Sequence, residues 1–281
     1  MNNFLIRAVG GLGLVGVLVF MLWVYFVNFT EAGRGYFFNK HLLVIRQLAK
    51  KLVDYVMGLS RHISYKAGTI IAIIFVMLIN TALLKVMGLK PNVPLYPQGE
   101  AGESFLIMVV ASLFGVFILW GQMALLHSFL SFRIKQKNEV VEAIGCITYP
   151  LSKSDKMWVN IVAGLGVIFV ALCALFLLNG VPENIANELP TIIKGLLLAV
   201  VNIIINILLI IKNLIIFFII LSFVAIFTRR MDYIAITNEW VSTLGFSVFP
   251  VKLRLLMFDF SPIIALWLCG IVHTILIGLL V

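Results

Sequence analysis

Histidines are the residues of this chain best suited to hold a redox cofactor. His41 and His62 lie in a stretch rich in basic residues, whereas His127 and His273 lie within apolar stretches. Two histidines on facing helices at one depth could ligate a haem iron, which makes a haem-binding membrane subunit one alternative. Because His127 falls near the end of one predicted span and His273 in the middle of another, we expect no bis-histidine site and no other cofactor.

Polar side chains inside apolar stretches form a second group of candidates. His273 lies in the last apolar run, and Lys212 and Asn206 lie in the run before it. Polar groups at membrane depth are costly, so they are functional candidates by default. Together with Asn202 they could line a pore, which makes a channel or transporter for ions or small solutes another alternative. The simpler explanation for His273 is a neutral ring bonded to the backbone of a neighbouring helix.

The residue patterns that catalysis requires are missing from the sequence. It contains no glycine-rich phosphate loop, nucleophile elbow or paired-carboxylate arrangement. Its cysteines, Cys146, Cys173 and Cys269, have no CxxC spacing and predict neither a disulfide framework nor a metal site. We therefore expect a protein that is not an enzyme.

The composition indicates which elements must position these residues. The 281 residues are 62% hydrophobic and 12% charged, whereas soluble domains are roughly half apolar and a quarter charged. A helix needs about 20 apolar residues to cross a bilayer. Stretches of that kind cover residues 8–27, 68–86, 105–130, 159–178, 207–227 and 263–281. The sequence therefore predicts an all-α polytopic transmembrane protein with about six spans.

Basic residues are concentrated in alternate loops between the predicted spans. Seven of the 21 Lys and Arg lie between spans one and two, five between spans three and four, and four between spans five and six. Cytoplasmic loops carry such an excess, so these loops are predicted inside and both termini outside. We expect the net charge of +9 to serve contact with anionic lipid headgroups, and we expect no nucleic-acid partner.

Residues 191–228 form an apolar run that is too long for one ordinary span. Lys194, Asn202 and Asn206 interrupt its first part. Residues 191–206 are therefore predicted to form an interfacial or re-entrant helix leading into span five, with a short seventh span as the alternative.

A repeat in the predicted cytoplasmic loops is the clearest signal in the sequence. The repeated residues, at a constant offset of 100, are Asn138, Glu139, Val141, Gly145 and Pro150 in one copy and Asn238, Glu239, Val241, Gly245 and Pro250 in the other. An internal duplication is the better explanation for so many identities in one short window. We expect each glycine at a helix end or tight turn and each proline at the stop before a second loop segment.

The repeat divides the chain into units of span, helical loop and span. The second unit covers 100–180 and the third covers 190–281, while 1–90 has the same architecture without the repeated residues. All units enter the membrane from the same side, so they are predicted to be three parallel helical hairpins with amphipathic cytoplasmic loops.

The last predicted span is preceded and entered by the residues Asp259, Phe260, Ser261 and Pro262. This sequence resembles the Asp-Phe-Ser-Pro entry into a span in the YggT family of small bacterial and plastid membrane proteins. Lys252 and Arg254 stand where that family has an adjacent arginine pair. The match covers about the last 85 residues, and the third hairpin departs from the one or two that are common in the family.

The resemblance implies a bacterial inner-membrane protein that organises or assists assembly of membrane components, or contributes to osmotic and stress tolerance. Its partners would be other membrane proteins, and a homo-oligomer remains open. The motif also has a purely structural explanation: Ser261 or Asp259 can cap the sixth helix, and Pro262 suits a first helical turn. Lys252 and Arg254 are expected to contact lipid headgroups.

Overall fold

A computed structural model describes residues 19, 22–23, 26, 40–58, 64–90, 104–178, 185–250, 254–255, 258–259 and 261–279. Nearly all of these residues are helical. The helices are α4 (Lys40–Gly58), α5 (Tyr65–Val86), α6 (Phe105–Arg133), α7 (Glu139–Ile147), α8 (Met157–Leu178), α9 (Ile185–Phe227), α10 (Met231–Val248) and α11 (Ser261–Gly278). The fold is therefore all-α, as the sequence predicts.

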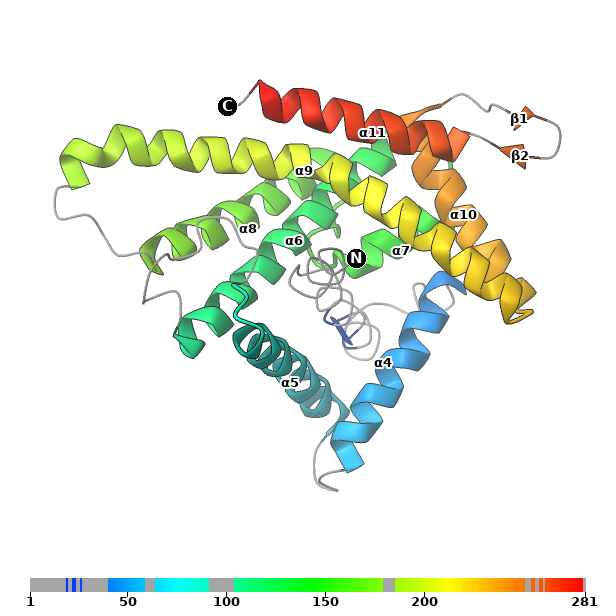
Figure 1. Cartoon of the computed structure of the whole chain (residues 1–281), viewed down its shortest axis with the longest axis horizontal. Coiled ribbons are helices and arrows are strands. Elements are labelled where there is room, and N and C mark those ends of the chain that lie inside the picture. The colour runs from blue at the N-terminus through cyan, green and yellow to red at the C-terminus, as the bar shows by residue number, and fades with distance from the viewer. Residues whose placement is uncertain are drawn as a thin grey trace.

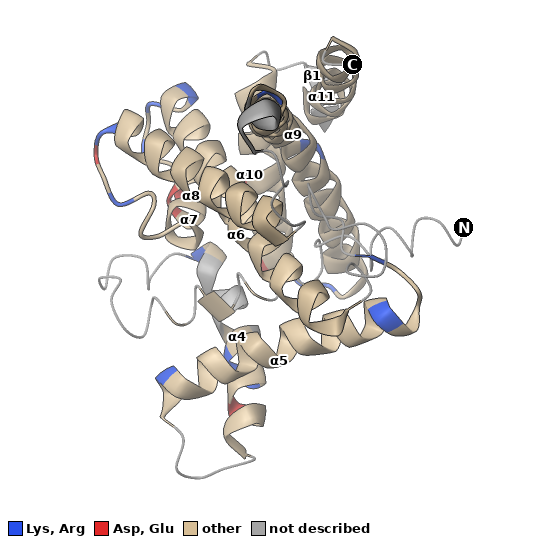
Figure 2. Cartoon of the chain, turned by 90° about the vertical axis from the view of Figure 1, so that its left-hand side faces the viewer, with Lys and Arg blue, Asp and Glu red and all other residues tan. Residues whose placement is uncertain are grey.

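Five of the described helices, α5, α6, α8, α9 and α11, are long and apolar enough to cross a membrane. They contain the predicted spans 68–86, 105–130, 159–178 and 207–227 and most of 263–281, and they indicate a multi-pass membrane protein. The predicted span 8–27 lies outside the described residues, apart from the helical positions Val19, Leu22, Trp23 and Phe26. Figure 2 shows Lys and Arg mainly at helix ends and in the turns between helices.

Residues 191–206 do not form the re-entrant helix or the separate span that the sequence suggested. They belong to α9, one continuous helix of 43 residues from Ile185 to Phe227. Its end is a Schellman motif: the Arg230 amide donates to the Ala225 carbonyl at 2.9 Å, and Arg229, with a φ of 53°, turns the chain into α10. The helix continues through Lys194, Asn202 and Asn206 because polar side chains make one face of a helix polar without removing a backbone hydrogen bond.

The arrangement of span, short helix and span occurs twice, as α6–α7–α8 and as α9–α10–α11. Helix α8 packs along α6, and both α10 and α11 pack along α9. In Figure 1, α9 crosses the molecule with α11 beside its middle part and α10 beside its carboxyl-terminal part, while α4 and α5 form the opposite edge. Between α10 and α11, the two-residue strands β1 (Arg254–Leu255) and β2 (Phe258–Asp259) pair in antiparallel fashion.

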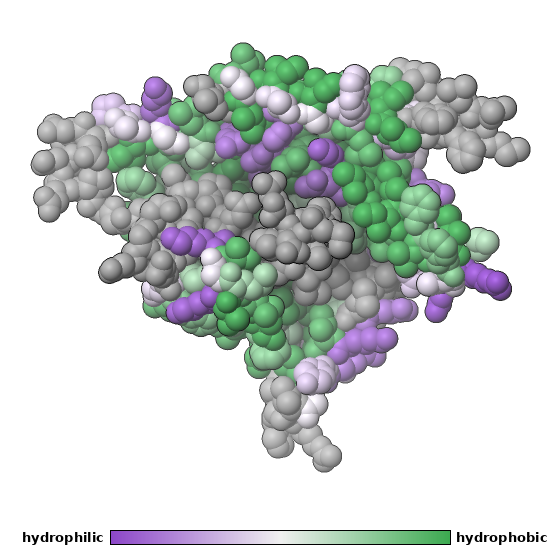
Figure 3. Space-filling view, in the orientation of Figure 1, coloured by the Kyte–Doolittle hydropathy of each residue, from purple (hydrophilic) through white to green (hydrophobic). Residues whose placement is uncertain are grey.

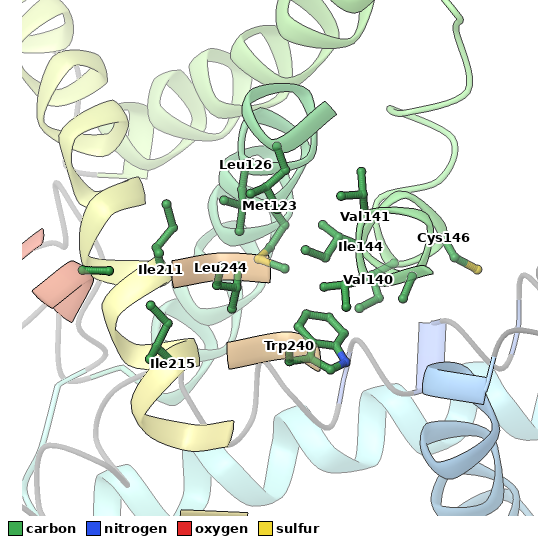
Figure 4. Close-up of a cluster of buried hydrophobic side chains, with 14 of the residues drawn as sticks. Met123, Leu126, Val140, Val141, Ile144, Cys146, Ile211, Ile215, Trp240 and Leu244 are labelled. Carbon is green, nitrogen blue, oxygen red and sulfur yellow. The ribbon is translucent and has the colours of Figure 1, made fainter. Parts of the chain in front are cut away.

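The core consists of two large apolar clusters that meet at α6. One joins α6 and α7 to α9, α10 and α11, and Figure 4 shows its α7 side chains Val140 and Ile144 on the side toward Leu244 of α10. The other joins α6 and α8 to α5 and α9. Gly121 and Gly164 let α6 and α8 approach closely, since a Cβ added to Gly121 would lie 2.8 Å from the Gly164 carbonyl oxygen.

Candidate functional site

The glutamates of the two repeat copies converge on one lysine. The Nζ atom of Lys40 lies 3.2 Å from Oε2 of Glu139 and 2.8 Å from Oε2 of Glu239. The ring Nε2 of His41 lies 3.7 Å and 3.5 Å from the same two oxygens. Lys40, His41, Glu139 and Glu239 are called the charged cluster below. It joins α4, α7 and α10, three helices that are distant in sequence.

Each helix brings its residue to the charged cluster in a different way. Helix α7 begins at Glu139 because the Asn138 side chain caps it, accepting hydrogen bonds from the amides of Val140 at 2.9 Å and Val141 at 3.2 Å. The Asn138 amide group also donates to Thr243 Oγ1 of α10 at 3.3 Å. The Asn138 side chain therefore fixes where α7 begins and also links α7 to α10, the helix that carries the other repeat copy.

The second copy has a different local structure. Asn238 and Glu239 lie inside α10, which starts earlier, at Met231. The Asn238 side chain therefore caps nothing and instead accepts a hydrogen bond from Ser222 Oγ of α9 at 3.3 Å. The same residue pair thus contributes a helix cap in one copy and a contact between helices in the other.

A tryptophan next to the second glutamate sets the state of the histidine ring. Trp240 Nε1 donates a hydrogen bond to His41 Nδ1 at 2.9 Å, and the indole stacks on Phe218 with ring centroids 4.5 Å apart. Because Nδ1 accepts this bond, the proton of the neutral imidazole is on Nε2, which faces the two carboxylates. The His41 side chain is 0% exposed.

Burial and charge act in opposite directions on the two basic groups. Burial lowers the pKa of His41 from 6.5 and is the largest effect. The charge of Glu239, the next largest effect, raises this pKa, repulsion from Lys40 lowers it, and Glu139 raises it, so the glutamates offset burial only in part. Hydrogen bonds to Glu239 and then to Glu139 raise the pKa of Lys40 above 10.5. At neutral pH the cluster therefore contains a neutral imidazole and an ammonium held between two carboxylates.

The ligand atoms of His41, Glu139 and Glu239 lie within 4.8 Å of one another, a spacing that could hold a metal ion. Two features of the cluster oppose that use. The Lys40 ammonium already contacts both carboxylates, and a neutral ring that accepts at Nδ1 has no lone pair on Nε2 to give to a metal. The arrangement suits charge pairing between helices better than metal binding.

The repeated glycines are contact points between helices. Gly145 and Gly245 each lie in the last turn of a helix, as expected, but not in a tight turn. A Cβ at Gly145 would lie 2.8 Å from His127 Nε2, and one at Gly245 would lie 3.2 Å from the Pro262 Cα. Pro150 and Pro250 follow the ends of α7 and α10, as predicted.

The residues of the Asp-Phe-Ser-Pro motif lie at the start of α11. Pro262 lies in the first turn of this helix, as expected, and Ser261 is its first residue. The capping role expected of Ser261 or Asp259 stays a prediction. Asp259 pairs through its backbone with Arg254 in the short hairpin. Phe260 and Lys252 lie outside the described residues, as do the side chains of Asp259 and Arg254. The predicted contact of Lys252 and Arg254 with lipid headgroups stays a prediction.

The polar residues of the last two spans form a separate group. His273 Nε2 lies 3.1 Å from Asn206 Oδ1, and the Asn206 amide group donates to Asn202 at 3.4 Å. The expectation of a backbone partner for His273 is therefore wrong, because a side chain of α9 takes that place. Lys212 lies in the same groove between α9 and α11. His127 lies elsewhere, with Nε2 3.4 Å from Ser131 Oγ.

Sequence reasoning identified Glu139 and Glu239 but missed their partners Lys40, His41 and Trp240. The repeat was the only signal for the glutamates. Lys40 and His41 are adjacent in the sequence and have no counterpart in the other units, and that difference could have pointed to them. Comparison of the chain with models of known protein families, with curated proteins and with solved structures found no match.

Proposed function

We propose that this chain is a non-enzymatic, YggT-like membrane protein that organises or assists assembly of other membrane components or contributes to osmotic or stress tolerance. The observation that carries the proposal is the use of the repeated glutamates. Glu139 and Glu239 pair with Lys40, so the most distinctive residues of the chain hold α4, α7 and α10 together. A rigid helical platform of this kind suits the docking of partners.

The surface of the spans supports the same role. Large apolar side chains are exposed on every candidate span, among them Phe75 of α5 at 48%, Phe223 of α9 at 58% and Trp267 of α11 at 70%. Lipid covers such faces in a single molecule, and helices of other membrane proteins can replace lipid there.

We further propose a bacterial inner-membrane location, with both termini outside. The platform of α4, α7 and α10 and the basic residues around it would then lie on the anionic inner leaflet. The repeat is interpreted as an internal duplication, because the same order of span, short helix and span surrounds both copies. Other membrane proteins, a second copy of the chain and anionic lipids are the partners that this location offers, and nucleic acid is not among them.

Affinity purification in mild detergent tests the role. We expect co-purifying membrane proteins with the wild-type chain and loss of most of them when Glu139→Gln and Glu239→Gln are combined. Glu142→Gln is the matched control, because Glu142 lies on α7 like Glu139 but pairs only with Lys137, an exposed residue before the helix, at 3.5 Å. Recovery of the wild-type chain with no partner above background would count against the proposal.

A channel or transporter is the second candidate, and the groove between α9 and α11 favours it. Its lining includes Lys212 and His273, and the Asn206 side chain bonded to His273 lies beside it. Ion and solute flux into liposomes containing the purified chain tests this function. A flux that decreases in the Lys212→Ala or His273→Ala variant would support a transport function. The absence of any flux would reject it.

A further inference from the structure

A large groove lies between the candidate spans α9 and α11. It has a volume of about 780 Å³ and is lined mainly by apolar residues of the two helices, both of which are candidate spans. Figure 3 shows hydrophilic side chains in the strip between α11 and α9, with hydrophobic surface on both sides. An occupant must therefore be largely apolar and must also satisfy polar groups.

Lys212 supplies the charge in this groove. Its ammonium lies against the backbone of α11, since a Cβ added to Gly270 would be 3.9 Å from Nζ. Within the described part of the chain, no carboxylate lies within ion-pair distance of Lys212. A cation at membrane depth is costly unless it is paired or reaches water. The groove is therefore complementary to an anionic group.

The distribution of polar groups favours a helix over a lipid. His273 and Thr274 line the groove together with Lys212, and Asn206, six residues before Lys212, lies about 9 Å further along α9. A lipid carries its polar atoms at one end, whereas a helix can present them over several turns. Gly270 and Thr274 are four residues apart on α11, the spacing that lets the backbone of another helix approach closely.

A second copy of the chain cannot supply the missing charge. The candidate spans α5, α6, α8 and α11 contain no Asp or Glu, and neither does α9 from Pro190 to Phe227. The predicted span 8–27 contains none either. A carboxylate at membrane depth must come from a different protein.

We propose that the groove between α9 and α11 binds a transmembrane helix of a different membrane protein, which places an Asp or Glu side chain against Lys212. This inference rests on the proposed assembly role and names the chemistry of the partner. The carboxylate pairs with the ammonium, and the apolar face of the helix covers the groove. Other polar side chains of the helix could bond to Thr274 and His273.

A designed peptide tests the groove without knowledge of the natural partner. The probe is a labelled poly-leucine transmembrane helix with one Glu, made as a set with Glu at successive depths, and its match has Gln at the same position. Energy transfer to the labelled full-length chain in phosphatidylcholine liposomes measures binding. We expect the best Glu peptide to bind at least about fivefold more tightly than its Gln match.

Variants assign that preference to the groove. Lys212→Met should abolish the difference between the Glu and Gln peptides, and Lys212→Arg should keep it. Gly270→Leu should weaken both peptides by filling the groove. Gly166→Leu is its matched control, because no atom lies within 4 Å of a Cβ added at Gly166 of α8.

Several outcomes would overturn the inference. Equal binding of the Glu and Gln peptides would do so, as would a preference that survives Lys212→Met. Loss of the preference when phosphatidylglycerol replaces phosphatidylcholine would identify a lipid headgroup as the occupant and would also reject a partner helix. If partners co-purify equally with wild type and with Lys212→Met, the assembly role would stand, and only the groove would be rejected as the binding site.

Discussion

His41 is the one buried titratable group of the charged cluster, and its protonation couples the cluster to pH. Its pKa is lowered from 6.5 in the folded chain, first by burial and further by Lys40. The unfolded chain therefore binds a proton more readily than the folded chain below about pH 6.5. The stability that the neutral ring contributes is present above that pH and is lost as the pH falls toward the folded pKa.

We predict that the thermal stability of the purified chain falls by a few degrees between about pH 7.5 and about pH 5.5. His41→Gln should flatten this part of the profile. Both proteins retain Glu139 and Glu239, so the two proteins differ only at position 41. A thiol-reactive fluorogenic dye can report unfolding through the buried Cys146 and Cys269. Identical pH profiles for the two proteins would show that His41 does not couple stability to pH.

Lys40 separates two like charges, and its removal should cost more than the loss of an ion pair with a single carboxylate. We predict that Lys40→Met lowers the melting temperature by a few degrees, because Glu139 and Glu239 then face each other with ligand oxygens within 4.8 Å. Adding Glu239→Gln should restore most of the loss. Lys137→Met is the control, since the side chain of Lys137 is 86% exposed and such pairs contribute about 0–1 kcal/mol.

The sequence predicted part of the charged cluster and could not predict the rest. The offset of 100 singled out Glu139 and Glu239, because a duplication is visible without a structure. Their common contact with Lys40 depends on where the first residue of α4 lies relative to α7 and α10. No local pattern encodes that packing, so only the three-dimensional arrangement reveals the pair of ion pairs and the Trp240 bond that sets the His41 tautomer.

Among the helices, the contact between α6 and α8 depends on a pair of glycines. We predict that Gly121→Ala lowers the free energy of unfolding by about 1–3 kcal/mol. Its Cβ would lie 2.6 Å from Ile168 Cγ1 and 2.8 Å from the Gly164 carbonyl oxygen, and backbone cannot move aside cheaply. Gly166→Ala on α8 meets nothing within 4 Å and should change little. Thermal unfolding of both variants measures the difference, and equal stabilities would contradict the close approach.

The spans were predictable within a few residues at the described ends because long apolar runs have few alternatives to a helix. Helix α9 shows where that reasoning fails. Asn202 and Asn206 looked like an interruption, yet they are four residues apart and share one face, where Asn206 bonds to His273 of α11. Polar residues in an apolar run can mark either the end of a helix or one polar face of a helix that continues. The facing residue on α11, which decides between the two, is far away in the sequence.

For the whole molecule, the length of α9 is the feature that the bilayer must accommodate. Its 43 residues extend about 65 Å at 1.5 Å per residue, about twice the thickness of the hydrocarbon core. The helix must therefore tilt, bend or project beyond the bilayer. Its carboxyl-terminal end leads through Arg229 and Arg230 into α10, and the excess of basic residues predicts that this end is cytoplasmic.

Labelling of introduced cysteines with a membrane-impermeant maleimide tests the orientation of the whole chain. Lys50→Cys and Lys135→Cys should react only after the membrane is opened, because both lie in segments rich in basic residues that the charge distribution places inside. Lys90→Cys should react in intact cells, since it follows α5 on the opposite side. The side chains at all three positions are exposed, so unequal burial cannot produce the pattern. Reaction at position 50 or 135 in intact cells would show the opposite topology. The charged cluster would then lie at the outer face, away from the anionic inner leaflet.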